Sequence, residues 1–371
     1  MTPSDLTGPT PLRSWYARPG ARAWSPGPAP DSAAIRAFHT TLPGYAPTPL
    51  TELPSLAAGL GVGRVFVKDE SDRLGLPAFK ALGASWAIHR ILAELPPDTS
   101  VHLVTATDGN HGLAVARFAR LRGLTAHVLV PDAVHPAAVD AIAAEGAAVT
   151  RVDGDYDEAV ARAARAAQAP GAVLVQDTGL PGHDRVPRWI VDGYATLFAE
   201  VDEQLAAAGV RAPDLLAVPV GVGSLAQAAV THLRRRPHGP ALLTVEPEAA
   251  PALLASLRAG RRVTVPTSPT ALTGLHCGTP SSLAWPLLRE GVDAAVAITE
   301  TEAARATRDL TALGVPAGPC GAAALAGVRA ALTGEDAAGR AAALGLDGAA
   351  TVVLLCTEGA AANPASAAFT G

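Results

Sequence analysis

Short runs of β-branched and apolar residues alternate with Ala- and Leu-rich stretches from residue 64 onward, and this alternation constrains the fold more than any other feature. In stretches such as 113–123 and 138–146, apolar residues recur at spacings of three and four, which is typical of helices. Strands that alternate with helices form βα units on a mostly parallel sheet. The strands are predicted at residues 64–67, 101–106, 126–131, 148–152, 172–176, 215–220, 241–246, 294–299 and 350–356.

Glycine- and proline-rich loops follow four of these strands, at residues 107–112, 177–182, 221–224 and 357–364. In open α/β sheets, ligands bind outside the carboxyl ends of the strands. We therefore expect the four loops to converge on one site. No repeat and no long low-complexity linker separates the halves of the chain, so a second domain is expected to be an inserted segment.

The composition disfavours several classes of protein. The chain has 371 residues, 49% of them hydrophobic, which is enough for two domains or one large α/β domain. A formal net charge of −5 gives no general attraction to nucleic acid or to anionic membranes. The N-terminal segment lacks the apolar core of a secretory signal, and no segment reaches about 18 uninterrupted apolar residues, so we expect a cytoplasmic protein.

Two local features carry no catalytic signal. Residues 1–32 are rich in Pro, Gly and Arg and are expected to form an extended or poorly ordered arm. The three cysteines, Cys277, Cys320 and Cys356, are widely separated and odd in number, which fits neither a disulfide framework nor a CxxC metal site. No metal site is predicted.

Only two of the 29 Lys and Arg residues are lysine, Lys68 and Lys80. A lysine amine can lose its proton and attack a carbonyl, whereas a guanidinium group does not deprotonate in proteins. Lys68 lies beside Asp69 and Glu70, which are expected to hold it protonated in a structural role. Lys80 opens a predicted helix, where an apolar pocket and the positive helix end would lower its pKa and prepare a Schiff-base lysine. The alternative is a solvated lysine at a helix start.

The segment PVGVGSLAQAAV at residues 219–230 places a glycine turn between a strand and a helix. Backbone N–H groups and the helix dipole can hold a phosphate there. The segment also fits G-x-G-x-x-A with Glu246 at the end of the next strand, the fingerprint of a nicotinamide dinucleotide site. A dinucleotide enzyme has no need for Lys80, so the scarcity of lysine favours pyridoxal phosphate.

Seven motifs follow one another along the chain: KDESDRLGLPAFKALGAS at 68–85, TDGNHG at 107–112, QDTGLPGH at 176–183, VPRWIVDGYATLFAE at 186–200, GVGSLA at 221–226, GLHCGTPSSLAWP at 274–286 and CTEG at 356–359. Together they resemble the fold type II pyridoxal-phosphate enzymes, and within them the diaminopropionate ammonia-lyases, from about residue 44 onward. TDGNHG and QDT are more specific than the glycine loop, because dehydratases of this fold usually carry a serine where this chain has Asp108.

The resemblance implies an α/β fold of the tryptophan synthase β-like type, with two open, mostly parallel sheets flanked by helices. It implies a large pyridoxal-phosphate-binding domain from residues 1–99 and 181–371 and a small inserted α/β domain from residues 100–180. A homodimer with pyridoxal 5′-phosphate as cofactor is also implied.

The same resemblance implies the cofactor-binding residues. Lys80 is expected to form the internal aldimine, and Asn110 to hydrogen-bond the pyridoxal 3-oxygen. Thr357 is expected to face the pyridine nitrogen, although Cys356 stands where the family has serine and is the other candidate. Cys320 also replaces a more usual serine, and both cysteines are interpreted as packing changes. The phosphate is expected on the backbone of Gly221, Val222, Gly223, Ser224 and Leu225.

Two aspartates complete the predicted site. An aspartate in a loop is commonly a helix cap or a turn residue, and Asp108 fits that description as well. Under the resemblance, Asp108 and Asp177 become an acid/base pair, because 2,3-diaminopropionate has a second amine that leaves protonated and an α-proton that must be removed. His111 is interpreted as a positioning or capping residue, and His276 as a pocket-wall or core residue.

The predicted function is a pyridoxal-phosphate-dependent lyase of amino-acid metabolism that converts 2,3-diaminopropionate into pyruvate and ammonia. The substrate is a small amino acid, and neither nucleic acid nor a membrane is an expected partner. One alternative is a serine/threonine dehydratase-like or β-replacement enzyme acting on a related amino acid. A more distant alternative is an NAD-dependent oxidoreductase, supported by the glycine loop and Glu246. A cofactor-binding protein without catalysis is disfavoured by the presence of Lys80 and both aspartates.

Overall fold

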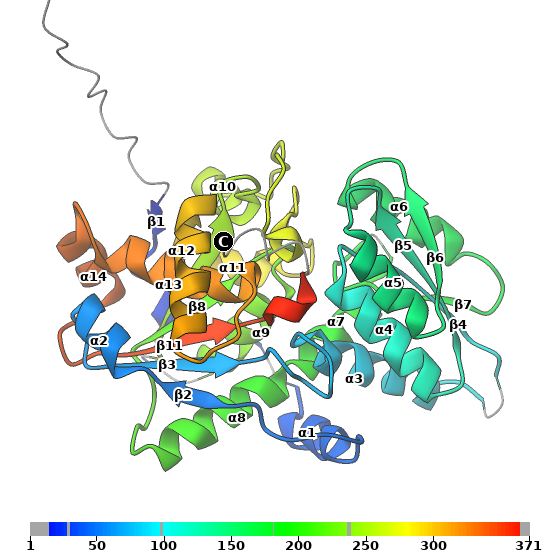
Figure 1. Ribbon diagram of the computed structural model, residues 1–371, viewed down its shortest axis with the longest axis horizontal. Helices are drawn as coiled ribbons and strands as arrows, with labels where there is room; N and C mark the ends of the chain where they lie inside the picture. Colours follow the sequence, from blue (N-terminus) through cyan, green and yellow to red (C-terminus); the bar gives the residue numbers. More distant parts are fainter. Residues whose placement is uncertain (1–14, 28–29, 97–98, 181, 236–238, 364–371) are drawn as a thin grey trace, which may run out of the picture.

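Two β-sheets organise the computed structural model, which describes residues 15–27, 30–96, 99–180, 182–235 and 239–363 (Figure 1). The large sheet has seven strands in the order β1-β10-β9-β8-β11-β3-β2, and the small sheet has four in the order β6-β5-β4-β7. The strands are β1 Trp15–Ala17, β2 Leu50–Glu52, β3 Arg64–Asp69, β4 His102–Ala106, β5 Thr125–Pro131, β6 Ala148–Val152, β7 Ala172–Leu174, β8 Leu215–Pro219, β9 Ala241–Pro247, β10 Ala294–Ile298 and β11 Thr351–Cys356.

The strand pairing confirms the predicted α/β class. All pairs in the small sheet are parallel, as are the pairs that join β10, β9, β8, β11 and β3 in the large sheet. Each of the nine predicted runs overlaps an observed strand. The sequence did not predict β1 and β2, which have three residues each and pair antiparallel at the two edges of the large sheet. A strand this short has no alternating pattern to reveal it.

Helices cover both faces of each sheet. They are α1 Ser32–Thr40, α2 Pro54–Leu60, α3 Lys80–Ala93, α4 Asn110–Leu121, α5 Pro136–Ala144, α6 Tyr156–Ala166, α7 Arg185–Gly193, α8 Ala195–Ala207, α9 Ser224–Leu233, α10 Ala252–Ala259, α11 Trp285–Gly291, α12 Glu300–Ala312, α13 Pro319–Leu332 and α14 Ala337–Leu344. Within the described residues, every helix is too short or too polar to span a bilayer.

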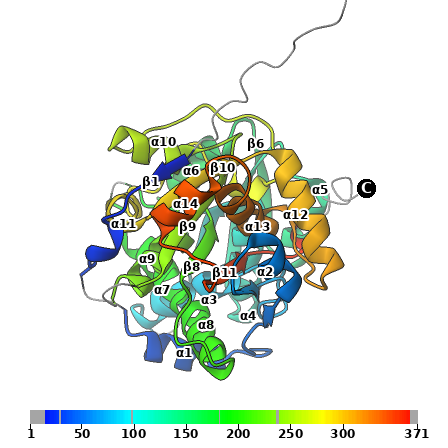
Figure 2. The ribbon, with the colours of Figure 1, turned by 90° about the vertical axis from the view of Figure 1, so that its left-hand side faces the viewer.

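The buried strand β11 shows why a continuous apolar run fits between two helical layers. Successive side chains of a strand point to opposite faces. Val353 and Leu355 join the core on the face of α7, α8 and α9, and Val352 and Leu354 join the core on the face of α2, α12 and α13. Figure 2 shows β8, β9 and β11 between these two sets of helices. Both faces of the strand are buried, so it reads as apolar throughout.

Small residues let the helices approach closely. A Cβ atom at Gly327 of α13 would lie 2.2 Å from Cγ2 of Val245 on β9, so α13 packs almost directly on the sheet. A Cβ atom at Gly83 of α3 would meet the Tyr194 ring at 2.6 Å. On the small sheet, α4 and α6 pack on opposite faces, and α3 packs against α4. The position of α3 links the two sheets, because it also contacts α7.

The predicted N-terminal arm needs a correction. Residues 15–17 form β1 and pair with β10, and Arg22 makes an ion pair with Asp293 at 3.1 Å. Residues 15–27 are therefore part of the large sheet and its border, because an edge strand gains backbone hydrogen bonds that a free arm lacks. Residues 1–14 and 28–29 lie outside the described residues. The domain boundaries near residues 100 and 180 stay a prediction.

Candidate active site

A pocket lies where the carboxyl ends of β8 and β11 meet those of the small sheet. Its lining includes residues 107–111, Asp177, residues 219–225, and Thr357, Glu358 and Ala362. All four predicted loops therefore contribute to it, although residues 181 and 364 lie outside the described residues. The other lining residues are Phe79, Lys80, Tyr156, residues 273–275, Cys277 and Cys320.

Lys80 is the first residue of α3 and points into this pocket. The backbone before it is fixed to the loop after β11, because Ala78 bridges Glu358 and the Phe79 N–H donates to the Thr357 carbonyl at 3.2 Å. The Lys80 ammonium forms an ion pair with the Asp177 carboxylate. Burial lowers the pKa of Lys80, but the charge and hydrogen bond of Asp177, together with smaller contributions from Tyr194 and Cys277, outweigh burial and raise it above its usual value. The predicted lowering of this pKa is wrong for the protein alone, since Asp177 holds the amine as an ammonium.

The two aspartates differ in protonation. Burial raises the pKa of Asp177, but the charge and hydrogen bond of Lys80, together with the charge that His111 carries at low pH, outweigh it and lower the pKa to about 2. Burial raises the pKa of Asp108 to about 8, with a further contribution from the charge of Asp177. At neutral pH, Asp177 is therefore ionised and Asp108 is protonated. Two carboxyl groups whose pKa values are pushed apart in this way are suited to separate base and acid roles.

The glycine loop is built to receive an anion. Gly223 has φ +98°, a left-handed conformation that favours glycine, and α9 begins at the next residue. A Cβ atom at Gly221 would lie 3.0 Å from the Gly274 carbonyl oxygen and 3.1 Å from Cys277 Sγ, so only glycine allows the two loops to approach this closely. Within the described residues, the backbone N–H groups of 221–225 donate no hydrogen bond. Unpaired N–H groups at a helix N-terminus fit a phosphate group.

Glu246 is not available to a ribose. Its Oε1 and Oε2 accept hydrogen bonds from the backbone N–H groups of Leu253 and Leu254 at the start of α10, at 2.7 Å each. The side chain is buried, and burial raises its pKa to about 8. The dinucleotide alternative therefore lacks its acidic residue, because Glu246 serves as a cap on α10.

Asn110 and Thr357 lie in the pocket, as predicted. The Asn110 Nδ2 donates to Glu358 Oε2 at 2.5 Å, and Glu358 Oε1 accepts from the Cys320 backbone N–H at 3.2 Å. Cys356 packs in the core between the sheet and α13, with its Sγ 3.4 Å from the Glu358 carbonyl oxygen. Thr357 and not Cys356 therefore faces the pocket, whereas Cys320 lines it.

Glu358 and Tyr156 belong to the pocket but were not predicted. Glu358 is 3% exposed, and burial raises its pKa. The Tyr156 hydroxyl accepts from Gln176 Nε2 at 2.9 Å and lies 3.4 Å from Asp177 Oδ1. Glu358 follows Thr357 directly in a loop at the end of a strand, so its position in the sequence could have predicted its place in the pocket. Tyr156 opens a helix of the small sheet, and no pattern around it marked it.

The two histidines have different places. His111 Nε2 lies 2.8 Å from the Val175 carbonyl oxygen, which can only accept, so Nε2 carries the proton. Burial lowers the pKa of His111, and its Nδ1 has no partner within the described residues. His111 is thus a neutral, oriented residue of the pocket wall. His276 does not line the pocket.

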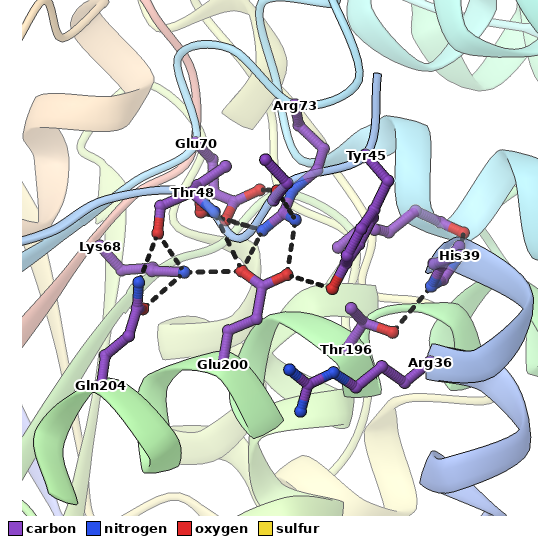
Figure 3. A network of polar contacts seen from close by, with 12 residues as sticks. Arg36, His39, Tyr45, Thr48, Lys68, Glu70, Arg73, Thr196, Glu200 and Gln204 are labelled. Atoms are coloured by element: carbon purple, nitrogen blue, oxygen red, sulfur yellow. Dashed lines mark hydrogen bonds and ion pairs between the residues drawn. The ribbon is translucent and has the colours of Figure 1, made fainter. Parts of the chain in front are cut away.

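Lys68 is structural, as predicted, but its direct partner is a residue distant in sequence (Figure 3). Its Nζ donates to the Thr48 carbonyl oxygen at 2.7 Å, to Glu200 Oε2 at 2.7 Å and to Gln204 Oε1 at 2.9 Å. The side chain is fully buried, and burial lowers its pKa against the opposing charges of Glu70 and Glu200. Glu70 is held by Arg73.

The geometry decides between the two cofactors left open by the sequence. A primary amine stands beside a cradle for a single phosphate, and the acidic residue of a dinucleotide site is occupied elsewhere. Such a pocket, between two α/β sheets, defines a pyridoxal-phosphate-dependent enzyme of fold type II. A model of the family described as pyridoxal-phosphate dependent enzyme matches residues 41–358, and the chain belongs to this family.

Within the family, the chain is similar to diaminopropionate ammonia-lyases. The enzyme of Salmonella typhimurium (strain LT2) is 35% identical over 358 residues, which cover 88% of this chain and 88% of that protein. The crystal structure of Escherichia coli diaminopropionate ammonia-lyase in complex with an aminoacrylate-pyridoxal-phosphate azomethine intermediate has a TM-score of 0.86 and 31% identity, covering 96% of both chains. The same enzyme in complex with D-serine has a TM-score of 0.85 and 31% identity, covering 92% of both chains.

Proposed function

We propose that this protein eliminates ammonia from 2,3-diaminopropionate, giving pyruvate and a second ammonia after the aminoacrylate product hydrolyses. The observation that carries the proposal is the pair of carboxyl groups around Lys80, with Asp177 ionised and Asp108 protonated at neutral pH. The activity named for the relatives from Salmonella typhimurium and Escherichia coli supports it.

The pocket fits pyridoxal 5′-phosphate, which supplies an electron sink for the negative charge left on the α-carbon when its proton is removed. In the proposed arrangement, Lys80 holds the aldehyde, and the backbone N–H groups of 221–225 hold the phosphate. Asn110 binds the 3-oxygen, with its amide oriented by Glu358. Thr357 faces the pyridine nitrogen, a role supported by its place in the pocket lining.

The chain's own groups can move the protons that the reaction requires. Lys80 would accept the α-proton of one enantiomer when its amine is free and neutral. Asp108 accepts the α-proton of the other enantiomer from the opposite side, after the positive charge of the bound substrate has lowered its pKa and it has lost its own proton. Asp177 binds the β-ammonium group and keeps it protonated, so that the Cβ–N bond breaks with its electron pair going to nitrogen and the group leaves as neutral ammonia. The D-serine complex of the Escherichia coli enzyme is consistent with a pocket that admits D-amino acids.

A substrate panel tests the proposed reaction. Protein loaded with pyridoxal phosphate should release pyruvate and ammonia from L-diaminopropionate and from D-diaminopropionate, with kcat/KM at least about 100-fold above that for serine or threonine, because the hydroxyl group cannot pair with the Asp177 carboxylate as an ammonium does. Keto acid formation is the measurement. Faster turnover of serine or threonine would assign the protein to the dehydratases instead.

The pH dependence of stability tests the state of Asp108. Its pKa, about 8 in the folded protein, lies above the ordinary aspartate value, so the folded state binds this proton more tightly. The associated stability is complete below about pH 4 and is lost as the pH rises to about 8. Asp108→Asn avoids this loss. In the cofactor-free protein, the Tm of the variant relative to wild type should rise by about 5 °C between pH 5 and pH 8.5, which corresponds to about 4 kcal/mol.

Asp177→Asn is the matched control for that measurement. The pKa of Asp177 is lowered to about 2, so its ionised form stabilises the protein above about pH 4. Removing its charge also leaves the Lys80 ammonium unpaired, and the Tm should fall at neutral pH. A Tm difference for Asp108→Asn that does not change with pH would show that Asp108 is already ionised below neutrality.

We also propose that the protein is a cytoplasmic homodimer. Both statements are supported by the resemblance of the chain to its family.

A further inference from the structure

Tyr194 has a buried hydroxyl group that forms no hydrogen bond. It lies between α7 and α8, and its side chain is fully buried. Its hydroxyl has no partner within the described residues. Nearly all buried hydroxyl groups are paired, because an unpaired one has lost its bonds to water without replacement. The unpaired hydroxyl group of Tyr194 therefore calls for a functional explanation.

The ring of Tyr194 packs against the first turn of α3. It packs against Phe79, a pocket residue, with ring centroids 4.9 Å apart. Its Cε1 lies where a side chain at Gly83 would stand, 2.6 Å from that Cβ position. Phe79 and Gly83 flank Lys80 in the sequence. The two contacts therefore fix the Tyr194 ring against the backbone that carries Lys80, the residue proposed to hold the cofactor.

The hydroxyl lies near the phosphate cradle. Burial raises the pKa of Tyr194, whereas the nearby Lys80 charge and the Ser224 hydroxyl oppose that rise. The Ser224 hydroxyl is close, yet it does not meet the geometry of a hydrogen bond with Tyr194. Ser224 is the first residue of α9, is 3% exposed and lines the pocket. The hydroxyl groups of Tyr194 and Ser224 are thus neighbours that form no hydrogen bond with each other. Both lie beside the backbone N–H groups of residues 221–225.

We propose that Tyr194 is a positioning residue for the phosphate group of the cofactor, acting through Ser224. When the phosphate binds, the Ser224 hydroxyl donates to a phosphate oxygen, and its own oxygen then accepts from the Tyr194 hydroxyl. A phosphate dianion offers only acceptors, so each donor must be supplied by the protein. The chain of two hydroxyl groups has one direction, from Tyr194 to Ser224 to phosphate, and both groups are satisfied only in the loaded enzyme. This inference depends on the proposed place of the phosphate at residues 221–225.

Tyr194→Phe tests the proposal in two measurements with opposite signs. In the cofactor-free protein, the variant should have an equal or higher Tm, because the substitution removes an unpaired buried hydroxyl and keeps the ring. Its Kd for pyridoxal 5′-phosphate, measured by absorbance titration without substrate, should rise about tenfold. A residue with a merely structural role would lower the Tm and leave the Kd unchanged.

Tyr45→Phe is the matched control. The Tyr45 hydroxyl donates to Glu200 Oε1 at 3.0 Å, and Tyr45 does not line the pocket. Its loss should lower the Tm of the cofactor-free protein and leave the Kd for pyridoxal phosphate within about twofold of wild type. The two tyrosine substitutions remove the same atom and should give opposite results.

Two further measurements test whether Tyr194 acts on the phosphate group and through Ser224. Pyridoxal without its phosphate should bind Tyr194→Phe and wild type equally, because the proposed contact lies on the phosphate. Ser224→Ala should weaken pyridoxal phosphate binding, and the double variant should be no weaker than Ser224→Ala alone, since both act through one hydrogen-bond chain. An unchanged Kd for pyridoxal phosphate in Tyr194→Phe, or an equal loss for pyridoxal, would overturn the proposal. Because substrate is absent, this outcome is distinct from a failure of the proposed lyase activity.

Discussion

Replacing Lys80 with arginine is expected to abolish the lyase activity while leaving the fold intact. Arginine keeps a positive charge beside Asp177, so the partly buried ion pair that Lys80 forms retains a cationic partner. A guanidinium group does not deprotonate, so it can neither hold the aldehyde nor accept an α-proton. The loss of the base alone is worth about 10²–10⁴-fold, and we expect kcat/KM to fall by at least about 10³-fold.

The measurement combines pyruvate formation with the visible absorbance of bound cofactor, which should disappear in Lys80→Arg. Lys68→Arg is the matched variant, because it makes the same exchange at the other lysine. Lys68 contacts Glu200 and no pocket residue, so its exchange should lower stability but keep the visible absorbance. Retained absorbance in Lys80→Arg, or its loss in a folded Lys68→Arg, would move the cofactor lysine to Lys68.

The fold was predictable because its signal is local. The parallel strands are buried on both faces, so each reads as an apolar run whatever its neighbours are, and β11 is an example. The site followed from the same logic, since loops at the carboxyl ends of parallel strands share one edge. The distant edge strands β1 and β2 depend on pairing with β10 and β3, which no local pattern contains.

The electrostatics of the site could not be derived from the sequence. The pKa of Lys80 was expected to be lowered, but it depends on an aspartate 97 residues away that folds against it. Similarly, Lys68 was expected to pair with the neighbouring Asp69 and Glu70, yet its direct partner is Glu200, 132 residues along the chain. Charged pairs of this kind are set by tertiary packing, and only a resemblance to a known family identified Asp177 in advance.

The network around Glu200 holds the segment that leads to Lys80 (Figure 3). Glu200 accepts from Arg73 Nη1 at 2.7 Å, from Arg73 Nη2 at 2.8 Å and from Lys68 Nζ at 2.7 Å. Arg73 also pairs with Glu70, so two cations balance two anions in a fully buried cluster. Glu70 follows β3, and Arg73 stands seven residues before Lys80, so the cluster joins α8 to the segment that leads to Lys80.

Glu200→Ala should therefore be the most destabilising single substitution considered for this protein. It leaves Lys68 and Arg73 buried with only Glu70 to balance them, and removing one partner of a buried ion pair costs about 3–5 kcal/mol. The measurement is the free energy of unfolding in denaturant. Glu203→Ala on the same helix is the control, because the Arg36 pair that it removes is exposed and is worth under about 1 kcal/mol.

The pH dependence of the same two proteins completes the test. Burial raises the pKa of Glu200, but Arg73 and Lys68 outweigh it and lower the pKa to about 2, below the ordinary glutamate value. A lowered folded pKa stabilises the protein above about pH 4, and that stability is lost as the pH falls toward 2. Wild type should lose stability steeply across this window, whereas Glu200→Ala should lose less because its carboxylate is already gone. Equal pH slopes for the two proteins, or an equal cost for Glu203→Ala, would mean that the buried cluster contributes no more than a surface pair.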